Sequence, residues 1–302
     1  MFMKNQARFI PVLILSFMTF FSHLASASSY QSFYRYNDAR QVTAVIQPKQ
    51  DNGKYLATRK TYNNQGLLTK VENGYLTGYL SSSSTAPSNW SNFTIQNSLL
   101  YTYDAWGRQL SSTEKDTNNN IISIKQKKYN AIGLLECEMT RMSASISNNA
   151  CLASNHNGIY DRVTKYSYHA NNSDIVKIKK AVGSPEEQDY ATFSYLRKGV
   201  RESATDANNN YSKYKYDGFG RLSHWYFPSK TKGANIENSA DFEYYKYDNN
   251  SNLTYKRKRS GEVIRYEFDP LNRQKKKNIS GSAKDVYYAY DNRGLQTYAR
   301  FA

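Results

Sequence analysis

The chain has 302 residues and a formal net charge of +16, and it contains 28 tyrosines but only 6 prolines. Hydrophobic residues make up 39% of it, which suits a sheet with solvent-exposed faces better than a two-layer sandwich with a thick aliphatic core. Its length allows one large domain or two small ones, and no linker between domains is visible. The basic charge alone does not select any particular partner.

Residues 1–27 are predicted to be a secretory signal peptide. Lys4 and Arg8 give it a basic start, residues 9–21 are almost entirely apolar, and Ala25-Ser26-Ala27 has the form of a cleavage site. The alternative, a transmembrane anchor, needs about 20 apolar residues, and this run is shorter. No cysteine follows the run, so a lipoprotein anchor is not expected. We therefore expect export to the periplasm, the extracellular space or the cell surface, with no membrane span after cleavage.

A short motif recurs along residues 28–302. In the copy from Tyr214 to Leu222, two tyrosines flank one lysine, so their rings lie on the same face of a strand. Asp217 can accept a hydrogen bond from the backbone two residues later, which starts a turn. Gly220 supplies the positive φ that the turn needs, and Leu222 begins the return strand. Each copy is therefore predicted to be a β-hairpin.

Ten copies of the motif can be aligned on their second aromatic residue, at Tyr36, Tyr62, Tyr103, Tyr129, Tyr168, Tyr195, Tyr216, Tyr247, Phe268 and Tyr290. Four residues later, six copies have Gly66, Gly107, Gly133, Gly199, Gly220 and Gly294. Asn172, Ser251 and Asn272 replace glycine in three copies, and Asn is the next best residue for this conformation. Arg40 in the first copy fits poorly, which predicts a different turn there.

The assignment of the repeat depends most on Tyr101, Tyr103, Asp104, Gly107, Arg108, Tyr214, Tyr216, Asp217, Gly220, Arg221, Tyr245, Tyr247, Asp248, Tyr266, Asp269, Tyr288, Tyr290, Asp291 and Gly294. A second turn signal recurs between copies, at residues 51–53, 116–120, 206–210 and 260–261. Each unit thus has a turn at both ends, and the whole chain is predicted to be a β-meander.

This motif resembles the YD repeat of the Rhs family, which also occurs in teneurins and in the C subunits of insecticidal toxin complexes. The resemblance covers most of the chain and is carried by Tyr101 to Arg108, Tyr214 to Leu222, Tyr245 to Leu253 and Tyr288 to Leu295. It implies a spiral β-sheet that forms a hollow shell.

Two features depart from large Rhs proteins. The chain stops at Ala302, eleven residues after Asp291, so we expect no toxin cargo. It has no Asp-Pro-x-Gly-Leu segment of the kind that ends the Rhs shell, and Asp269-Pro270-Leu271 is an ordinary repeat turn. The resemblance therefore implies neither self-cleavage nor toxin activity.

The expected fold is all-β, a repeat array of YD-type hairpins forming a curved, open or partly wound antiparallel sheet. Ten hairpins give about twenty strands, and at ~4.8 Å between strands the sheet would extend roughly 95 Å along its curve. One closed turn of that length would have a radius of about 15 Å, too small to hold a folded domain. An open, twisted sheet is favoured, since sheets of this size curl or split.

Two irregular insertions are predicted, near residues 76–100, which include a serine run at 81–84, and near 137–160. The chain's two cysteines, Cys137 and Cys151, lie in the second one. In an exported protein they should pair, closing a loop of about 15 residues that the chain-entropy model values at ~3 kcal/mol. A catalytic or redox thiol is disfavoured, because the spacing is not C-x-x-C.

Basic residues cluster at 125–128, 256–259 and 275–277 among tyrosines. Such clusters could grip nucleic acid, lipopolysaccharide or an acidic glycan; the alternative is a solvated strand face where lysine prevents aggregation. Export makes nucleic acid the less favoured ligand. The partners considered are therefore a glycan or other anionic surface polymer, and a toxin or other Rhs-type protein.

No catalytic, cofactor-binding or metal-binding residues are predicted. His156, His169 and His224 lie far apart and in no metal-ligand spacing, and His169 occupies a turn position. The recurring aspartates have a turn role in every copy, and no phosphate-binding glycine loop or G-x-S-x-G motif is present. An enzyme acting on glycan or nucleic acid would need a cluster of carboxylates or histidines that the sequence does not show.

The function expected from the sequence is that of an exported, non-enzymatic Rhs-type protein that acts as a surface-interaction or carbohydrate-binding scaffold. The alternative is a shell fragment or accessory of a separately encoded Rhs or toxin delivery system.

Overall fold

The computed structural model describes residues 31–78, 85–147, 149–196, 199–281 and 285–301, and the proposed signal peptide and the serine run at 81–84 lie outside these ranges. The described residues are all-β apart from one short 3₁₀ turn, η1 (Pro87–Asn89). The strands are β1 (Phe33–Tyr36), β2 (Val42–Lys49), β3 (Tyr55–Tyr62), β4 (Leu68–Leu76), β5 (Phe93–Tyr103), β6 (Gln109–Lys115), β7 (Ile121–Tyr129), β8 (Leu135–Arg141), β9 (Asn155–His156), β10 (Ile159–Tyr160), β11 (Arg162–Tyr168), β12 (Ile175–Lys180), β13 (Gln188–Tyr195), β14 (Arg201–Asp206), β15 (Tyr211–Tyr216), β16 (Leu222–Pro228), β17 (Glu237–Tyr247), β18 (Leu253–Arg257), β19 (Val263–Phe268), β20 (Gln274–Ile279), β21 (Val286–Tyr290) and β22 (Gln296–Phe301).

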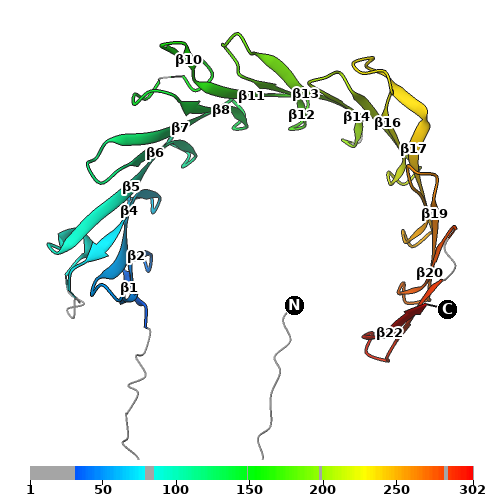
Figure 1. Cartoon of the computed structure of the whole chain (residues 1–302), viewed down its shortest axis with the longest axis horizontal. Coiled ribbons are helices and arrows are strands. Elements are labelled where there is room, and N and C mark those ends of the chain that lie inside the picture. The colour runs from blue at the N-terminus through cyan, green and yellow to red at the C-terminus, as the bar shows by residue number, and fades with distance from the viewer. Residues whose placement is uncertain (1–30, 79–84, 148, 197–198, 282–284, 302) are drawn as a thin grey trace, which may run out of the picture.

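Twenty of these strands form one antiparallel sheet in which each strand pairs with its neighbours in the chain. The order departs from the chain only where β8 pairs with β11, because the separate hairpin β9–β10 lies between them in sequence. The sheet curves into an open arc that runs from β1 to β22 (Figure 1). The prediction of an open, curved antiparallel sheet of about twenty strands is confirmed.

Two kinds of strand alternate along this sheet. A motif strand ends at the second aromatic residue of a repeat, as β15 ends at Tyr216, and the following return strand starts after the turn, as β16 starts at Leu222. The pairing register shifts by one residue just before that aromatic, as between Lys215 and Tyr216. This bulge increases the local twist, and its recurrence in every hairpin contributes to the curl of the sheet.

The turns between motif and return strands follow the sequence prediction in eight copies. Glycine has positive φ at all six expected positions, and Ser251 and Asn272 adopt the same conformation. Two expectations are wrong. Arg40 also has a positive φ of 59°, so its turn has the common form. Asn172 does not, because this turn closes from His169 to Asp174 with one extra residue and needs no left-handed residue at that point.

The buried core lies on one face of the first half of the sheet. A first cluster contains Ala44, Ile46, Ala57 and Leu76, and Trp90 from the loop between β4 and β5 covers it. The sequence predicts an insertion near residues 76–100, and in the structure Leu76 belongs to β4 and residues 93–100 belong to β5.

A second cluster contains Met139, Ala150 and Val163, covered by the segment between β8 and β11. Since β8 continues to Arg141, this insertion spans residues 142–161 rather than the predicted 137–160. The Cys137–Cys151 disulfide joins β8 to the insertion with a Cα–Cα distance of 5.3 Å.

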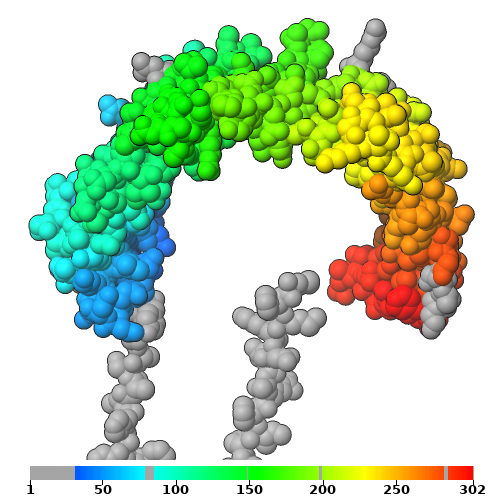
Figure 2. All heavy atoms as spheres, turned by 45° about the horizontal axis from the view of Figure 1, so that its top comes forward, coloured from blue at the N-terminus to red at the C-terminus, as the bar shows by residue number. Residues whose placement is uncertain are grey.

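The second half of the sheet is open on both faces. From Tyr211 to Phe301, Ile264 is the only buried residue among those that the structure describes. The space-filling view shows the sheet as an arch around a hollow, and its two ends do not meet (Figure 2). In the described ranges, no helix has the length and apolar character needed to cross a membrane.

Candidate functional site

The aspartates of the repeat organise the turns. In the Tyr214 copy, Oδ1 of Asp217 accepts hydrogen bonds from the backbone N–H groups of Phe219 and Arg221, both at 3.0 Å, and its Oδ2 pairs with Nε of Arg221 at 2.8 Å. The backbone N–H of Arg221 contributes most to lowering the pKa of Asp217, and its guanidinium adds to the effect. The same two backbone hydrogen bonds form at Asp104, Asp248, Asp269 and Asp291.

The second tyrosines of the repeat link successive hairpins. The hydroxyl of Tyr216 donates a hydrogen bond at 2.7 Å to the carbonyl of Arg201, the first residue of the preceding return strand, and we call this contact a tyrosine clasp. Equivalent clasps join Tyr62 to Val42, Tyr103 to Leu68, Tyr129 to Gln109, Tyr168 to Leu135, Tyr195 to Ile175, Tyr247 to Leu222 and Tyr290 to Gln274. Sequence reasoning did not foresee these long-range bonds.

Arginine at the end of the turn extends the link to the next hairpin. The guanidinium of Arg221 lies 4.7 Å from the ring centroid of Tyr247, and its Nη1 donates to the carbonyl of Asp248 at 2.8 Å. Arg108 over Tyr129 and Arg273 over Tyr290 make the same stacking contact, at 4.5 and 4.7 Å. The polar groups of these repeat residues therefore form hydrogen bonds and stacking contacts within the sheet itself.

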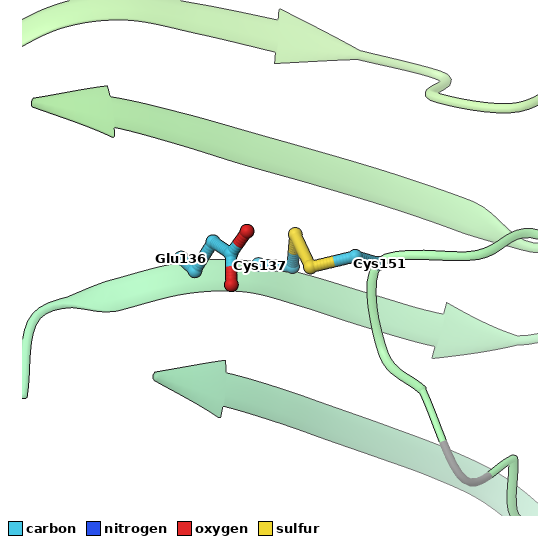
Figure 3. A group of neighbouring side chains, drawn as sticks. All are labelled: Glu136, Cys137 and Cys151. Carbon is cyan, nitrogen blue, oxygen red and sulfur yellow. A yellow bond between two sulfur atoms is a disulfide. The ribbon is translucent and has the colours of Figure 1, made fainter. Parts of the chain in front are cut away.

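One group of side chains has the spacing of a metal site but not its chemistry. Oxygen and sulfur atoms of Glu136, Cys137 and Cys151 lie within 4.8 Å of one another (Figure 3). Both sulfurs are joined in the disulfide, so neither is a thiolate that could bind a metal.

The three histidines among the described residues lie in different settings, as their sequence separation suggested. Nδ1 of His169 accepts the N–H of Asn171 at 3.2 Å, which confirms its role in a turn. Nε2 of His156 lies 3.5 Å from Oδ1 of the buried Asp161, and His224 is on the open sheet.

The basic clusters of the sequence do not form single patches. Successive residues point to opposite faces of a strand, and several of these cations pair with nearby acids. Lys256 lies 3.4 Å from Glu243, and Arg259 pairs with Asp241 at 2.6 Å. Lys128, Lys258, Lys275 and Lys276 have carboxylate partners as well.

A different surface gathers aromatic rings on the open half of the sheet. It consists of His224 and Tyr226 on β16, Phe242 and Tyr244 on β17, and Tyr255 on β18. The register places His224 opposite Tyr244 and Tyr226 opposite Phe242, with ring centroids 4.5 and 5.7 Å apart. Tyr255 continues the row, 5.7 Å from Tyr244. These half-buried rings form a continuous platform across three strands.

Four cations surround these rings, and together with the rings they make up what we call the aromatic–basic surface. Lys215 lies 5.2 Å from the Tyr226 ring centroid and Lys246 lies 5.5 Å from that of Tyr244. The Arg257 and Arg265 guanidiniums lie over Phe242 and Tyr255 at 4.2 and 5.6 Å. Among the described residues, none of the four has a carboxylate within ion-pair distance, so their charge is available to a ligand.

His224 is at the centre of this surface. Its ring is flanked by Tyr226, Phe242 and Tyr244, and Lys215 is opposite it on β15. Burial, together with the charge of Lys215, lowers the pKa of His224, so the imidazole is neutral at neutral pH. The surface can thus offer stacking faces to flat apolar groups and ion pairs to anions at its rim.

Sequence reasoning missed this surface because its members come from five strands. The available signal was the alternation of aromatics in His224-Trp225-Tyr226 and Phe242-Glu243-Tyr244, which places two rings of each strand on one face.

Together, the fold and the surface define an all-β repeat protein in which linked hairpins form one open sheet with a stacking and cationic face. No family model matches the chain, and no curated protein matches it.

Several solved structures are similar to the chain at low identity, and they include the following two. One is the Tc holotoxin pore of Photorhabdus luminescens, at 12% identity and a TM-score of 0.42, covering 88% of this chain and 15% of that chain. The other is TcdB2-TccC3 without its hypervariable C-terminal region, at 12% identity and a TM-score of 0.39, covering 91% and 15%. This chain thus spans only 15% of the length of either match, and neither match assigns it a function.

Proposed function

We propose that the protein is an exported, non-enzymatic scaffold of Rhs type whose aromatic–basic surface binds an acidic glycan. The observation that carries this proposal is the row of five rings flanked by Lys215, Lys246, Arg257 and Arg265. Sugar rings present flat C–H faces that stack on aromatic side chains, and uronate or sulfate groups pair with lysine and arginine.

Two features support export. The disulfide between Cys137 and Cys151 is of a kind that persists in oxidising compartments and is rare in the cytosol. The basic, apolar and small-residue order of residues 1–27 fits a leader that is removed on secretion. Export also makes nucleic acid the less favoured anionic ligand.

Calorimetric titration with polygalacturonate, a carboxylated polysaccharide, tests the proposal. Binding should weaken as salt is added, and the variant K215S/K246S should lose about tenfold in affinity, since two charge-assisted contacts disappear. The matched control is K230S/K232S, which removes the same charge from the exposed loop between β16 and β17 and should change affinity less than about twofold.

Three results would contradict the proposal. They are equal losses in the two variants, no binding of polygalacturonate or sulfated glycans, and tighter binding of single-stranded DNA of the same charge. The last result would assign the surface to nucleic acid instead.

A second candidate function is a part of a larger shell built with another Rhs-type chain or a toxin. It is favoured by the open arch, whose end strands β1 and β22 each pair with only one strand among the described residues. Purification from its native cells tests it: a second polypeptide in stoichiometric amount would support this function, and recovery of the chain alone would contradict it.

A further inference from the structure

The two ends of the sheet are different and complementary. β1 is a motif strand, and β22 is a return strand. Within the described sheet, nine junctions pair a return strand with the motif strand that follows it. Among the described residues, β1 and β22 each pair with one strand, so their outer edges have the form of the two halves of one more junction of the same kind.

Each end of the sheet carries one of the two groups that form a tyrosine clasp, the hydroxyl on β1 and the acceptor carbonyl on β22. Tyr36 is the second aromatic of its repeat, yet its hydroxyl has no partner among the described residues and its side chain is 60% exposed. The matching acceptor is the carbonyl of Gln296, the first residue of β22. It occupies the position that Gln274 has in β20, where the carbonyl accepts from Tyr290 at 2.8 Å.

The register of the internal junctions specifies how the two edges would pair. In eight of the nine junctions, the residue eight positions after the second aromatic of one repeat pairs with the residue three positions before that of the next. The exception is β12–β13, where the extra turn residue shifts the first position to nine. Ser203 with Lys213, His224 with Tyr244, Tyr255 with Arg265 and Lys276 with Tyr287 all follow this rule. Applied to β22 and β1, the rule pairs Tyr298 with Phe33 and Ala299 with Ser32, so it brings two aromatics together.

Among the residues that the structure describes, neither edge strand carries the usual protection against such pairing. Exposed edge strands normally have prolines, several charges or an inward-pointing charge. β1 and β22 have one arginine each and no proline, and they expose Tyr34, Tyr36, Tyr298 and Phe301 at 50%, 60%, 49% and 70%.

We propose that the protein associates with itself head to tail, with β22 of one copy pairing antiparallel with β1 of a second copy. The partner of β22 is a second copy of this chain, because β1 of that copy supplies the Tyr36 hydroxyl for the carbonyl of Gln296. The same register places Phe33 of that copy opposite Tyr298. The contact is heterologous, since each copy uses a different edge, so it builds a ring if the rotation closes and a filament if it does not. It continues the sheet without a break and requires no ligand.

Disulfide trapping tests the geometry in the full chain expressed with its own leader. Ser32→Cys and Ala299→Cys place one thiol at each end, at two exposed positions that the register rule brings face to face. An equimolar mixture of the two variants should form a covalent dimer on mild oxidation, and either variant alone should not. Cross-linking of Ser32→Cys with itself would show a symmetric contact, and no cross-linking in the mixture would show that the edges do not meet; either result overturns the proposal.

A second measurement does not depend on cysteine chemistry. Tyr36→Phe removes only the unused hydroxyl, so it should leave the thermal stability of the monomer unchanged. It should weaken self-association in sedimentation velocity by about fivefold, the value of one neutral hydrogen bond. Tyr216→Phe is the matched control: it breaks an internal clasp, so it should lower stability and leave association unchanged. A native protein that stays monomeric at high concentration would contradict the proposal.

Discussion

At the scale of single residues, the fold depends on one backbone position in each turn. Gly220 has φ +80°, and a Cβ added there would meet no atom within 4 Å. Gly218, two residues earlier in the same turn, has equally open surroundings but no positive φ. An alanine at either position meets no steric crowding, so a difference between the two substitutions reports backbone strain alone.

We expect Gly220→Ala to lower the free energy of unfolding by about 1 kcal/mol, because an L-residue is strained at positive φ. Gly218→Ala should be neutral or slightly stabilising, since it only restricts the unfolded chain. Urea denaturation of both variants measures the difference. Equal effects at the two positions would show that the conformation of Gly220 does not control the turn.

The second residue-scale feature is the one internal hairpin link that lacks a hydroxyl. Phe268 occupies the clasp position, and its counterpart would be the carbonyl of Leu253, the first residue of β18. Phe268→Tyr should therefore stabilise the protein by about 1 kcal/mol. Tyr247→Phe, which removes the clasp to Leu222, should destabilise it by a similar amount. Thermal unfolding of both variants checks this pair, and a destabilising Phe268→Tyr would mean that the hydroxyl cannot reach its acceptor.

At the scale of elements, the insertion at 142–161 is held to the sheet by three kinds of contact. The disulfide joins it to β8, Ala150 packs on Met139 and Val163, and Arg141 pairs with Asp161 at 2.6 Å. Both charged groups are buried, and Asp161 also accepts the backbone N–H groups of Met142 and Ser154. The insertion is thus a small folded cover on the first half of the sheet.

Removing the disulfide should loosen this cover without melting the far strands. The Cys137→Ala/Cys151→Ala variant should lose about 3 kcal/mol of loop-closure stabilisation. Hydrogen exchange should speed up in residues 142–161 and stay unchanged in β17 and β18, which lie in a distant part of the arc (Figure 1). Faster exchange in β17 would show that the sheet unfolds as one unit.

The sequence predicts some elements well because their cause is local. The aspartate and glycine of a turn act within five residues, so Asp217 and Gly220 are recognisable from their spacing. The tyrosine clasps join residues that are 15 to 35 positions apart in the chain, and the aromatic–basic surface combines side chains from five strands. The bulge before each second aromatic also shifts the pairing register. The simple alternation of side chains therefore cannot be continued from Tyr216 through the turn to predict on which face of the sheet His224 lies. The length of each insertion depends on where β5 begins to pair with β4 and where β8 stops pairing with its neighbours. No local sequence signal marks these two points.

At the scale of the whole molecule, the sheet is a linear array. Each strand touches mainly its two neighbours, so stability is approximately a sum over hairpins and their junctions. The ionised aspartates of the turns each contribute to this total stability. The pKa values of Asp104, Asp116, Asp206, Asp217, Asp248, Asp269 and Asp291 are all lowered by the hydrogen bonds that they accept.

We therefore expect the protein to lose stability in acid. An aspartate whose folded pKa is below its unfolded value of about 3.9 stabilises the fold above that pH, and this contribution is lost as the pH falls through the folded pKa. Urea midpoints should decrease as the pH is lowered from about 4 to about 2. Asp217→Asn keeps the Oδ1 acceptor, as Asn63 and Asn130 do naturally, and should reduce this slope. A slope identical to that of the native protein would contradict this assignment.

The agreement between strand order and chain order also determines how the molecule can be made. Partners are separated by a turn or a modest loop, so bringing them together costs little entropy even though the protein is all-β. A polypeptide that emerges from a ribosome or a translocation pore, amino end first, meets the pairing partner of each new strand already in place. Growth can then proceed by stepwise addition of each new strand to a finished edge.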